Sequence, residues 1–430
     1  MKKYIFFIIP IFLYGATFQD LIHSVDKNLL IQSKHKQNQA LKSLLHKTQA
    51  KRYPNLEMNL NATRLKDIPT TQLHISALPG LNQPLPMGTR TNLSAALSIT
   101  YPIFTGFAIS ENIEKAKLKI IKNRLETTDL KRQLYLKISM LYANIFTINK
   151  TIKATNDAKT AITDSYKKAK SMYDNGLINI ANLYKIEAKQ YEIIATLATL
   201  KNQKEQLVET LQYITNIKTD ITSLPPLTLH MDTKALIDMA LRNREDIQAL
   251  KTELKIDDKD ILLANSQSYP QIFLVGALKK EGDDLNLNGN GYTNADQSYI
   301  GATLRWNLFD GGAIKSEKEA ATYKKTAQRL YLQDYERSVT KEIHHALLKL
   351  QSLKRVQSAT QKELRSAKSY YELTQGRFDN GLISADELSR AIADFANIKA
   401  KFEGTKANIF LQKCNIYLLC GAHIFVKYTH

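Results

Sequence analysis

The chain has 430 residues, of which 43% are hydrophobic, so it can bury a large core or form two domains. Its 16 glycines and 10 prolines are few for a loop-rich enzyme. The formal net charge of +19 is compatible with nucleic-acid binding or with solvated helix faces. Because the cations are scattered and form no block of five or more, we favour solvated helix faces and expect no nucleic-acid partner.

The first residues predict export from the cytoplasm. Lys2 and Lys3 precede an apolar run from Tyr4 to Tyr14, which is the arrangement of a secretory signal peptide. The apolar run is too short to span a bilayer as a helix. We therefore interpret residues 1–16 as a signal peptide, with an uncleaved anchor as the alternative.

Two strands are predicted in the first half of the chain, after a helix from Phe18 to about Lys51. Apolar and polar residues alternate over residues 55–64 and again over 93–103, which is the period-2 pattern of a strand. The pattern suits a soluble sheet, and it also suits transmembrane strands of about ten residues with lipid on one face and water on the other. Each strand pair leads into a very long helix, which leaves no apolar surplus to cover the sheet.

The second half repeats these features. Strands are predicted over residues 271–279 and 299–309, joined by a shorter loop. Tyr101 and Trp306 occupy the same position in the two halves, near the strand ends. Aromatic side chains at such positions in a membrane protein lie at the lipid–water interface.

Long helices follow the strands in both halves. Apolar residues recur at spacings of three and four, which predicts coiled-coil packing. The pattern is carried by Leu134, Ile138, Leu141, Ile145, Ile148 and Ile152, and in the second half by Val339, Ile343, Ala346, Leu350 and Leu353. Each half should contain a helix of about 65 residues, a turn and a helix of about 40 residues. The longer helix would extend roughly 100 Å, which indicates an architectural rod rather than a catalytic scaffold.

A specific turn separates the two helices of each half, at residues 173–179 and 378–384. Gly176 and Gly381 each follow an asparagine and can adopt the left-handed conformation that ends a helix. Ser384 has a glutamate three residues later, which is the spacing of a capping box at the start of the next helix. We call these two turns the first and the second tip.

The chain is interpreted as an internal duplication. Phe309-Asp310-Gly311 lies 205 residues after Phe104-Thr105-Gly106, and the Asp-Asn-Gly-Leu-Ile sequences of the two tips have the same offset. Residues 17–225 and 226–430 are therefore assigned as two structural repeats. Four strands cannot close a membrane barrel, and open sheet edges do not occur in lipid, so transmembrane strands would have to be pooled by several chains.

These features together resemble the TolC-like outer membrane factor family of Gram-negative bacteria. The resemblance is carried by Leu308-Phe309-Asp310-Gly311-Gly312 at the strand exit, by the two tips and by the order of the elements. It implies an α+β membrane protein in which long antiparallel coiled-coil helices form a periplasmic tunnel. Four β-strands per chain would contribute to a 12-stranded barrel of a homotrimer in the outer membrane, in contact with its lipid.

The resemblance also implies a function. The protein would be a passive export duct of a tripartite efflux or type I secretion system, carrying drugs, metals or other substrates to the outside. Its partners would be a periplasmic adaptor (membrane fusion) protein and an inner-membrane pump of the RND or ABC type. Multidrug efflux and dedicated cation efflux are both compatible with the sequence. The alternative from a different class is a secreted coiled-coil structural protein or adhesin without a transport role.

The family resemblance assigns roles to the residues of the tips. Adaptor docking is expected at the positions that both tips share, with a purely turn-forming role of the glycines as the alternative: Asn175, Gly176, Leu177, Asn380, Gly381 and Leu382. Relatives narrow the closed tunnel with two acidic residues after the tip glycine. Glu387 matches the first of these, Arg390 replaces the second, and Asn182 is an uncharged counterpart in the first repeat. These three residues form a possible gate, although Glu387 alternatively serves only the capping box.

Residues typical of catalysis or cofactor binding are not found. The nine histidines form neither an H-x-H nor an H-E-x-x-H pattern, and no glycine-rich phosphate loop opens a helix. We therefore expect no cofactor, no metal and no enzymatic activity. Cys414 and Cys420 would lie about 9 Å apart along a helix, which is too far for a disulfide, so free buried thiols are favoured.

Overall fold

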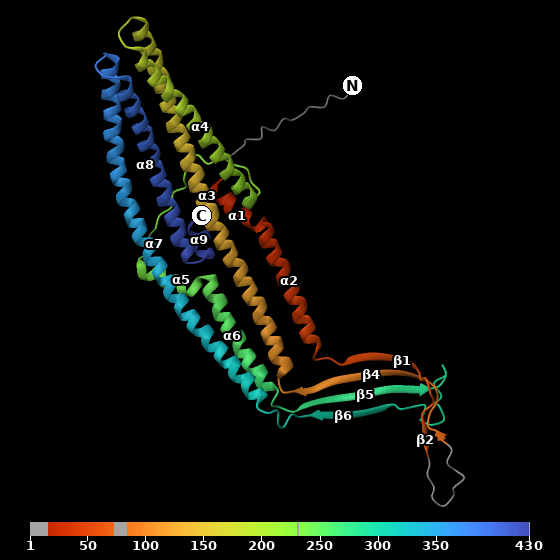
Figure 1. Cartoon of the computed structure of the whole chain (residues 1–430). Helices are drawn as coiled ribbons and strands as arrows, with labels where there is room; N and C mark the ends of the chain where they lie inside the picture. Colours follow the sequence, from red (N-terminus) through yellow and green to blue (C-terminus); the bar gives the residue numbers. More distant parts are fainter. Residues whose placement is uncertain (1–15, 73–83, 230–231, 430) are drawn as a thin grey trace, which may run out of the picture. The chain divides into compact units, whose positions relative to one another are not determined.

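The structure is a computed structural model that describes residues 16–72, 84–229 and 232–429 (Figure 1). The predicted signal peptide, residues 1–16, lies outside these residues except for Ala16. Contacts divide the chain into two compact units. Unit 1 contains Met1–Lys36, Asn123–Leu250 and Leu332–His430, and unit 2 contains Gln37–Lys122 and Lys251–Tyr331. Each unit takes segments from both sequence repeats, so the repeats are not separate compact units.

Helices dominate both units. Within the described residues the elements are α1 (Phe18–Ser24), η1 (Val25–Lys27), α2 (Leu29–Ala50), β1 (Asn55–Arg64), β2 (Thr70–Gln72), β3 (Pro84–Pro86), β4 (Thr91–Thr105), α3 (Ala108–Asp174), α4 (Ile180–Thr215), α5 (Thr233–Asn243), α6 (Glu245–Ser266), β5 (Gln271–Gly282), β6 (Tyr299–Arg305), α7 (Ala313–Asp379), α8 (Ala385–Leu419) and α9 (Ala422–Thr429). The two longest helices, α3 and α7, have 67 residues each. No helix in the described ranges combines the length and the apolar composition needed to cross a membrane.

The N-terminal helix is interrupted at Asn28, where a continuous helix to about Lys51 was expected. Asn28 Oδ1 accepts a hydrogen bond from the backbone nitrogen of Leu30 at 2.9 Å, and Asn28 Nδ2 donates to the carbonyl of Ile214 at 2.8 Å. An asparagine side chain competes in this way with helical backbone hydrogen bonds. The chain therefore leaves η1 at an extended Asn28 and begins α2 as a new helix.

The four longer strands form one antiparallel sheet in the order β1-β4-β5-β6, with β1 and β6 at its edges (Figure 1). β1 spans the expected range, whereas β4 and β5 are longer than expected. β6 ends at Arg305, four residues before the expected end. Its last partner is Gln271, and the preceding residue, Pro270, has no backbone N–H to extend the ladder.

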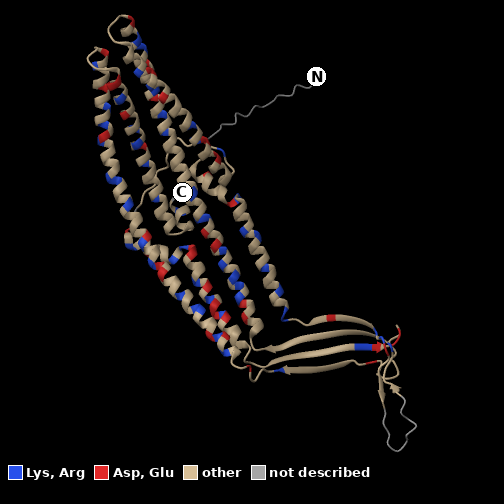
Figure 2. Ribbon diagram, viewed as in Figure 1, with Lys and Arg blue, Asp and Glu red and all other residues tan. Residues whose placement is uncertain are grey.

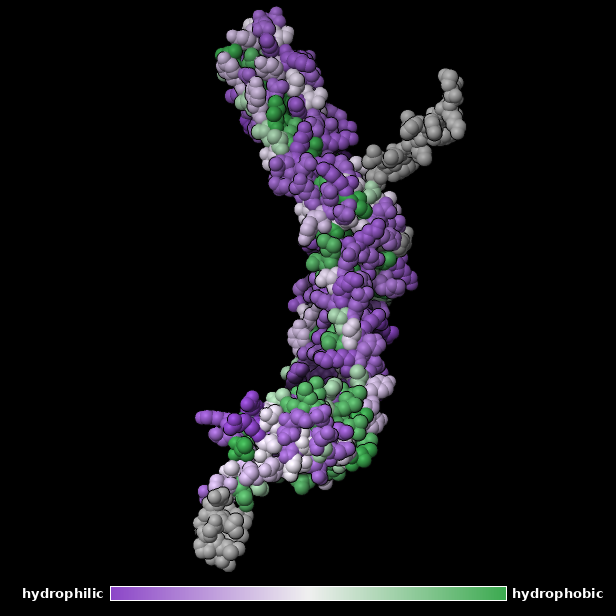
Figure 3. Space-filling view, turned by 90° about the vertical axis from the view of Figure 1, so that its right-hand side faces the viewer, coloured by the Kyte–Doolittle hydropathy of each residue, from purple (hydrophilic) through white to green (hydrophobic). Residues whose placement is uncertain are grey.

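One face of this sheet is apolar and uncovered within unit 2. The register aligns Met58, Leu97 and Leu278 in one row and places Ile99 and Ile300 on either side of a glycine in the next row. All five side chains are exposed. The strands carry few charged residues (Figure 2), and apolar side chains gather over the sheet (Figure 3). The alternation in the sequence therefore separates an apolar from a polar face.

A second, two-stranded sheet lies in the loop after β1. β2 pairs with β3 from Thr70↔Pro86 to Gln72↔Pro84. The sequence did not indicate these strands, because prolines lack the N–H that a central strand donates and therefore argue against strand formation.

Two helical hairpins lie side by side in unit 1, α3 with α4 and α7 with α8 (Figure 1). Their facing sides meet in a common core near the tips, formed by Ala158, Ile162, Ala169, Leu183, Ile186, Ile193, Leu197, Phe378, Ala385, Leu388 and Ile392. Small residues alternate with larger ones in this core, which lets the helices approach closely and interlock. The core holds both tips in place relative to each other.

Candidate functional site

The first tip ends α3 in a Schellman motif. Gly176 has a φ of +71°, the left-handed conformation that glycine adopts without a steric penalty. Its nitrogen donates to the carbonyl of Tyr173 at 2.8 Å, and the nitrogen of Leu177 donates to the carbonyl of Met172 at 2.8 Å. The side chain of Asn175 donates to the backbone carbonyl four residues before it, at 2.7 Å.

The second tip has the same turn, with the same hydrogen bonds at the equivalent residues. Gly381 has a φ of +72°, and its nitrogen donates to the carbonyl of Phe378 at 2.9 Å. The nitrogen of Leu382 donates to the carbonyl of Arg377 at 2.9 Å. The side chain of Asn380 donates to the backbone carbonyl four residues before it, at 2.8 Å. The two tips are therefore the same local structure, built from the same three residue types.

Both tips present an apolar side chain to solvent. Leu177 is 70% exposed and Leu382 is 69% exposed. The hydrogen bonds of the turn use only the backbone of this residue, so they do not require a leucine here. The predicted docking residues thus combine a fixed turn with an accessible leucine.

Each tip is followed by a capped helix. Asn179 Oδ1 accepts a hydrogen bond from the nitrogen of Ala181 at 2.5 Å, and Ser384 accepts one from the nitrogen of Glu387 at 3.3 Å. The latter is the serine half of the expected capping box.

Of the three predicted gate residues, Asn182 and Glu387 lie in the first turns of α4 and α8, and Arg390 lies one turn further along α8. Asn182 and Glu387 are half-buried, whereas Arg390 is exposed and forms an ion pair with Asp386 one turn before it. A hydrogen bond from Arg390 holds the pKa of Asp386 below its usual value. The second tip therefore carries a local ion pair where family relatives were expected to have an acidic residue.

Two ion pairs join the hairpins close to the tips. Lys168 Nζ of α3 lies 2.7 Å from Asp379 Oδ1 of α7, and Lys399 Nζ of α8 lies 2.8 Å from Asp157 Oδ2 of α3. All four side chains are more than a third exposed. These ion pairs link the two hairpins at the surface, in addition to the apolar core that they share.

A charge network that is largely buried, with Glu342 at its exposed side, lies elsewhere in unit 1. We call it the Arg244 network; it contains Arg132, Arg244, Asp246, Tyr335 and Glu342. Asp246 Oδ2 accepts from the hydroxyl of Tyr335 at 2.7 Å, and Arg244 and Arg132 approach the same oxygen at 3.0 and 3.1 Å. Arg244 also reaches Glu342 at 3.2 Å. Burial, and then the bond to Asp246, raise the pKa of Tyr335 to about 12.

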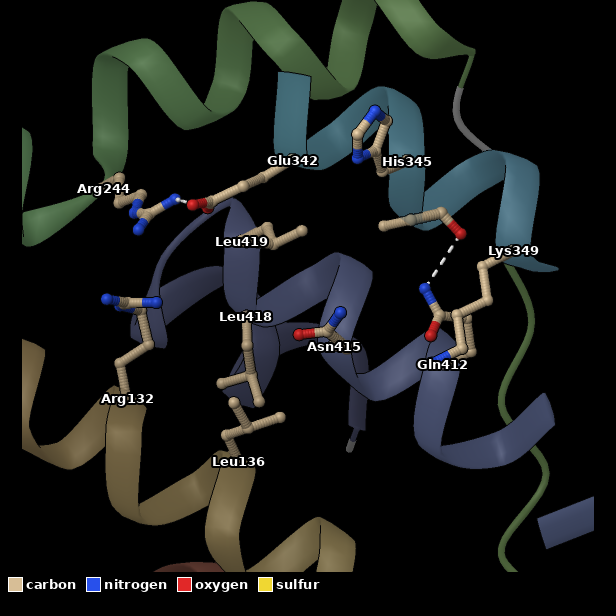
Figure 4. Close-up of a pocket in the computed structure, with 11 residues that line it drawn as sticks. Arg132, Leu136, Arg244, Glu342, His345, Lys349, Gln412, Asn415, Leu418 and Leu419 are labelled. Carbon is tan, nitrogen blue, oxygen red and sulfur yellow. Dashed lines mark hydrogen bonds and ion pairs between the residues drawn. The ribbon is translucent and has the colours of Figure 1, made fainter. Parts of the chain in front are cut away.

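A cavity of about 430 Å³ adjoins this network (Figure 4). Arg244 points toward Glu342 at one side of it, and Gln412 donates to the carbonyl of Ala346 at 2.9 Å at the other. In the part of the chain that the structure describes, no three His, Cys, Asp or Glu side chains form a metal-binding group. Of the charged residues that line the cavity, Arg244 is paired with Glu342, and Arg132 is paired with Asp129 and Asp246 beside it.

The predicted interface aromatics lie at the strand ends of unit 2. Tyr101 belongs to the apolar face of β4, and Trp306 follows β6 and donates its Nε1–H to the carbonyl of Ser268 at 3.1 Å. Edge-to-face ring contacts join Phe107 to two neighbouring rings at 5.3 and 5.9 Å. We call the aromatic residues at this end the aromatic collar: Phe104, Phe107, Tyr269, Trp306 and Phe309.

Several of these features were not predicted from the sequence. The ion pairs between the hairpins and the Arg244 network involve residues far apart in the chain. The run Arg244-Glu245-Asp246, at the junction of α5 and α6, was a signal in the sequence, because consecutive charged residues need partners when they are buried. Cys414 and Cys420 are free and buried, as expected.

Comparison with known proteins places the chain in a family. The family model described as outer membrane efflux protein matches residues 24–216 and 236–422. Outer membrane protein TolC of Escherichia coli is 20% identical over 349 residues, covering 76% of this chain and 69% of TolC. Nodulation protein T of Rhizobium leguminosarum bv. trifolii is 25% identical over a segment that covers 35% of this chain and only 32% of that protein.

The fold is also that of a solved channel. The CmeC outer membrane channel of Campylobacter jejuni superposes with a TM-score of 0.78 at 16% identity, covering 94% of this chain and 85% of CmeC. The predicted fold class, a helical part combined with strands of an outer-membrane channel, is confirmed. Because the family model matches most of both sequence repeats, the chain belongs to the outer membrane efflux protein family.

Proposed function

We propose that the chain is one subunit of a passive, homotrimeric export channel in the outer membrane. Three copies would pool four strands each into a 12-stranded barrel, and their helices would enclose a tunnel in the periplasm. The observation that carries the proposal is the sheet of unit 2, which has an uncovered apolar face and two edges, β1 and β6, that no described strand pairs. Such edges are not tolerated in lipid unless another chain completes them.

The tips are proposed as the docking site for a periplasmic adaptor protein, which connects the channel to an inner-membrane pump of the RND or ABC type. Support comes from Leu177 and Leu382, which are exposed although the turn does not require them. An apolar side chain on a rigid turn is the kind of anchor that a partner protein can bury. The glycines would fix the direction of this anchor.

The gate is proposed to use charge pairing rather than a ring of acids. Arg390 is engaged with Asp386, which neutralises charge at the second tip, and Asn182 adds none at the first. Glu387 is the acidic member of the predicted gate, and its backbone nitrogen donates to the hydroxyl of Ser384. The pump would supply the energy for transport, and the channel would supply a sealed path.

Two measurements test the proposal. Membrane fractionation should recover the protein in the outer membrane as a heat-modifiable oligomer, because a completed barrel resists detergent until it is heated. Deletion of the gene should increase sensitivity to drugs, metals or other exported compounds, and expression of the chain should restore resistance. Recovery in the medium or in the soluble periplasm would instead favour a secreted coiled-coil protein or adhesin.

A further inference from the structure

A cationic groove lies between α2 and α3 in unit 2, at the foot of the first strand pair. It has a volume of about 360 Å³. Lys47 and Lys51 line it from the end of α2, Lys119 lines it from α3, and Leu41 and Leu44 form its far end. We call these three lysines the groove lysines.

The groove lysines have no acidic partner among the described residues. Lys115, which also lines the groove, is paired with Asp260. The acids of the facing part of α3 are also engaged, since Glu111 pairs with Lys259 and Glu114 with Lys117. α2 itself contains four lysines and no aspartate or glutamate. The groove therefore carries an excess of about three positive charges, which an anion would neutralise.

The corresponding place in the second repeat is built differently. α6 contains six acidic residues, and its junction with α7 is closed by polar contacts. Gln267 Nε2 donates to Glu317 at 2.8 Å, and Lys318 donates to Asn265 Oδ1 at 3.2 Å. The fold can thus be built without a cationic groove at this position, so the groove is a property of the first repeat alone.

The groove lies close to the end of the apolar strand surface. Lys51 is four residues before β1, and α3 begins three residues after β4. The helical rise puts Lys47 about 5 Å before the end of α2 and Lys119 about 16 Å after the start of α3. The aromatic collar occupies the strand ends beside them, where rings mark the boundary of the hydrocarbon region. Long lysine side chains at this distance reach the headgroup layer.

We infer that the groove binds the phosphodiester headgroup of an anionic phospholipid in the leaflet that faces the helices. The groove lysines would contact the phosphate oxygens, and the acyl chains would run along the aromatic collar and the apolar face of the sheet. The inference rests on the membrane placement of the strands in the proposed function. Clusters of cations next to a membrane span attract anionic lipid headgroups in this way.

The test compares binding of soluble short-chain lipids to the full-length protein purified in a neutral detergent. Isothermal titration calorimetry with dihexanoyl phosphatidylglycerol should show saturable binding that weakens with salt. Changing Lys47, Lys51 and Lys119 together to glutamine should weaken this binding by at least about tenfold, because each lysine near a headgroup contributes about 1 kcal/mol, or roughly fivefold. Dihexanoyl phosphatidylcholine should bind weakly to both proteins.

The matched control changes Lys42, Lys255 and Lys315 to glutamine, which removes the same charge from exposed lysines on helices of the same unit outside the groove. This variant should bind phosphatidylglycerol within about twofold of the unchanged protein. Equal binding by the groove variant, or equal loss in the control, would overturn the inference. Glycerol 3-phosphate binding as tightly as phosphatidylglycerol would show a site for free anions rather than for lipid and would also overturn it.

Two readouts separate this inference from the proposed function. The groove variant should still form the heat-modifiable oligomer in the outer membrane and should restore resistance in the deletion strain. If the variant falls apart into single chains, the groove is a contact between subunits and the lipid assignment is wrong. If the unchanged protein is absent from the outer membrane, the proposed function itself fails.

Discussion

Polar contacts in unit 1 occur in two regions that differ in exposure. In the Arg244 network the side chain of Arg244 is 6% exposed, whereas Lys168 and Asp379 between the hairpins are 42% and 41% exposed. Removing one partner of a buried pair leaves an unpaired charge in a low-dielectric environment, whereas an exposed pair exchanges readily for water. The difference indicates that charge pairing helps to fix the helices around Arg244, whereas near the tips the apolar core holds the hairpins together and the exposed ion pairs add little.

The largest effect is expected from breaking the scaffold. Arg244→Met should lower the free energy of unfolding by about 3–5 kcal/mol, because Asp246 and Glu342 lose a buried cation. Denaturant unfolding of the purified protein measures the change. Arg390→Met is the matched control, since the same substitution at an exposed residue should change stability by less than about 1 kcal/mol. Equal effects at both positions would remove the distinction between the two regions.

The second prediction concerns the tip glycines. Gly381→Ala should cost about 1–2 kcal/mol of strain at its positive φ, shift the direction of Leu382 and reduce export, while the oligomer still reaches the outer membrane. Drug susceptibility and fractionation measure the two results. Gly376→Ala, in the last turn of α7 before this tip and with open space around it, should leave export unchanged. Normal resistance with Gly381→Ala would count against docking at this tip.

The third prediction concerns the ion pairs between the hairpins. A double-mutant cycle with Lys168→Gln and Asp379→Asn should give a coupling of at most about 1 kcal/mol, which decreases as salt is added. Loss of this link should raise the open fraction of the channel in planar lipid bilayers by up to about fivefold. A large coupling that does not depend on salt would place these residues with the buried scaffold.

The smallest effect is a pH dependence in the scaffold. Burial raises the pKa of Glu245, whose carboxylate accepts from the nitrogen of Ala422 at 3.0 Å. The folded protein therefore retains this proton at a pH at which the unfolded chain has lost it, so stability falls as the pH rises from about 4.5 through the folded pKa. Glu245→Gln should lose less stability than the unchanged protein over the same rise in pH. The measurement is the thermal unfolding temperature of both proteins at about pH 4 and pH 7. An equal change in unfolding temperature for the two proteins would refute the prediction.

The sequence was most informative where order along the chain decides structure. Alternation predicted β1 to its ends, and the asparagine–glycine pairs predicted the left-handed φ of Gly176 and Gly381, because these conformations depend on neighbouring residues. The family and the fold class were also predicted, and the comparisons confirm both.

Contacts between distant segments were not predictable in this way. The end of β6 depends on Pro270, the residue before β5, and the break of the first helix depends on a carbonyl of α4 that Asn28 reaches across the unit. The pairing of Lys399 with Asp157 likewise joins residues that no periodic pattern relates. Such features depend on how helices pack against one another, which a single sequence does not specify.

The two sheet edges have a consequence for how the protein is made. Each backbone group left unpaired in hydrocarbon costs several kcal/mol, and β1 exposes a row of such groups along ten residues. Under the proposed function, insertion of a single chain into the bilayer would be strongly unfavourable. Newly secreted copies would therefore have to associate before they insert. The yield of channels would then depend on the concentration of chains with an order higher than one. A misfolded copy would inactivate every oligomer that it joins.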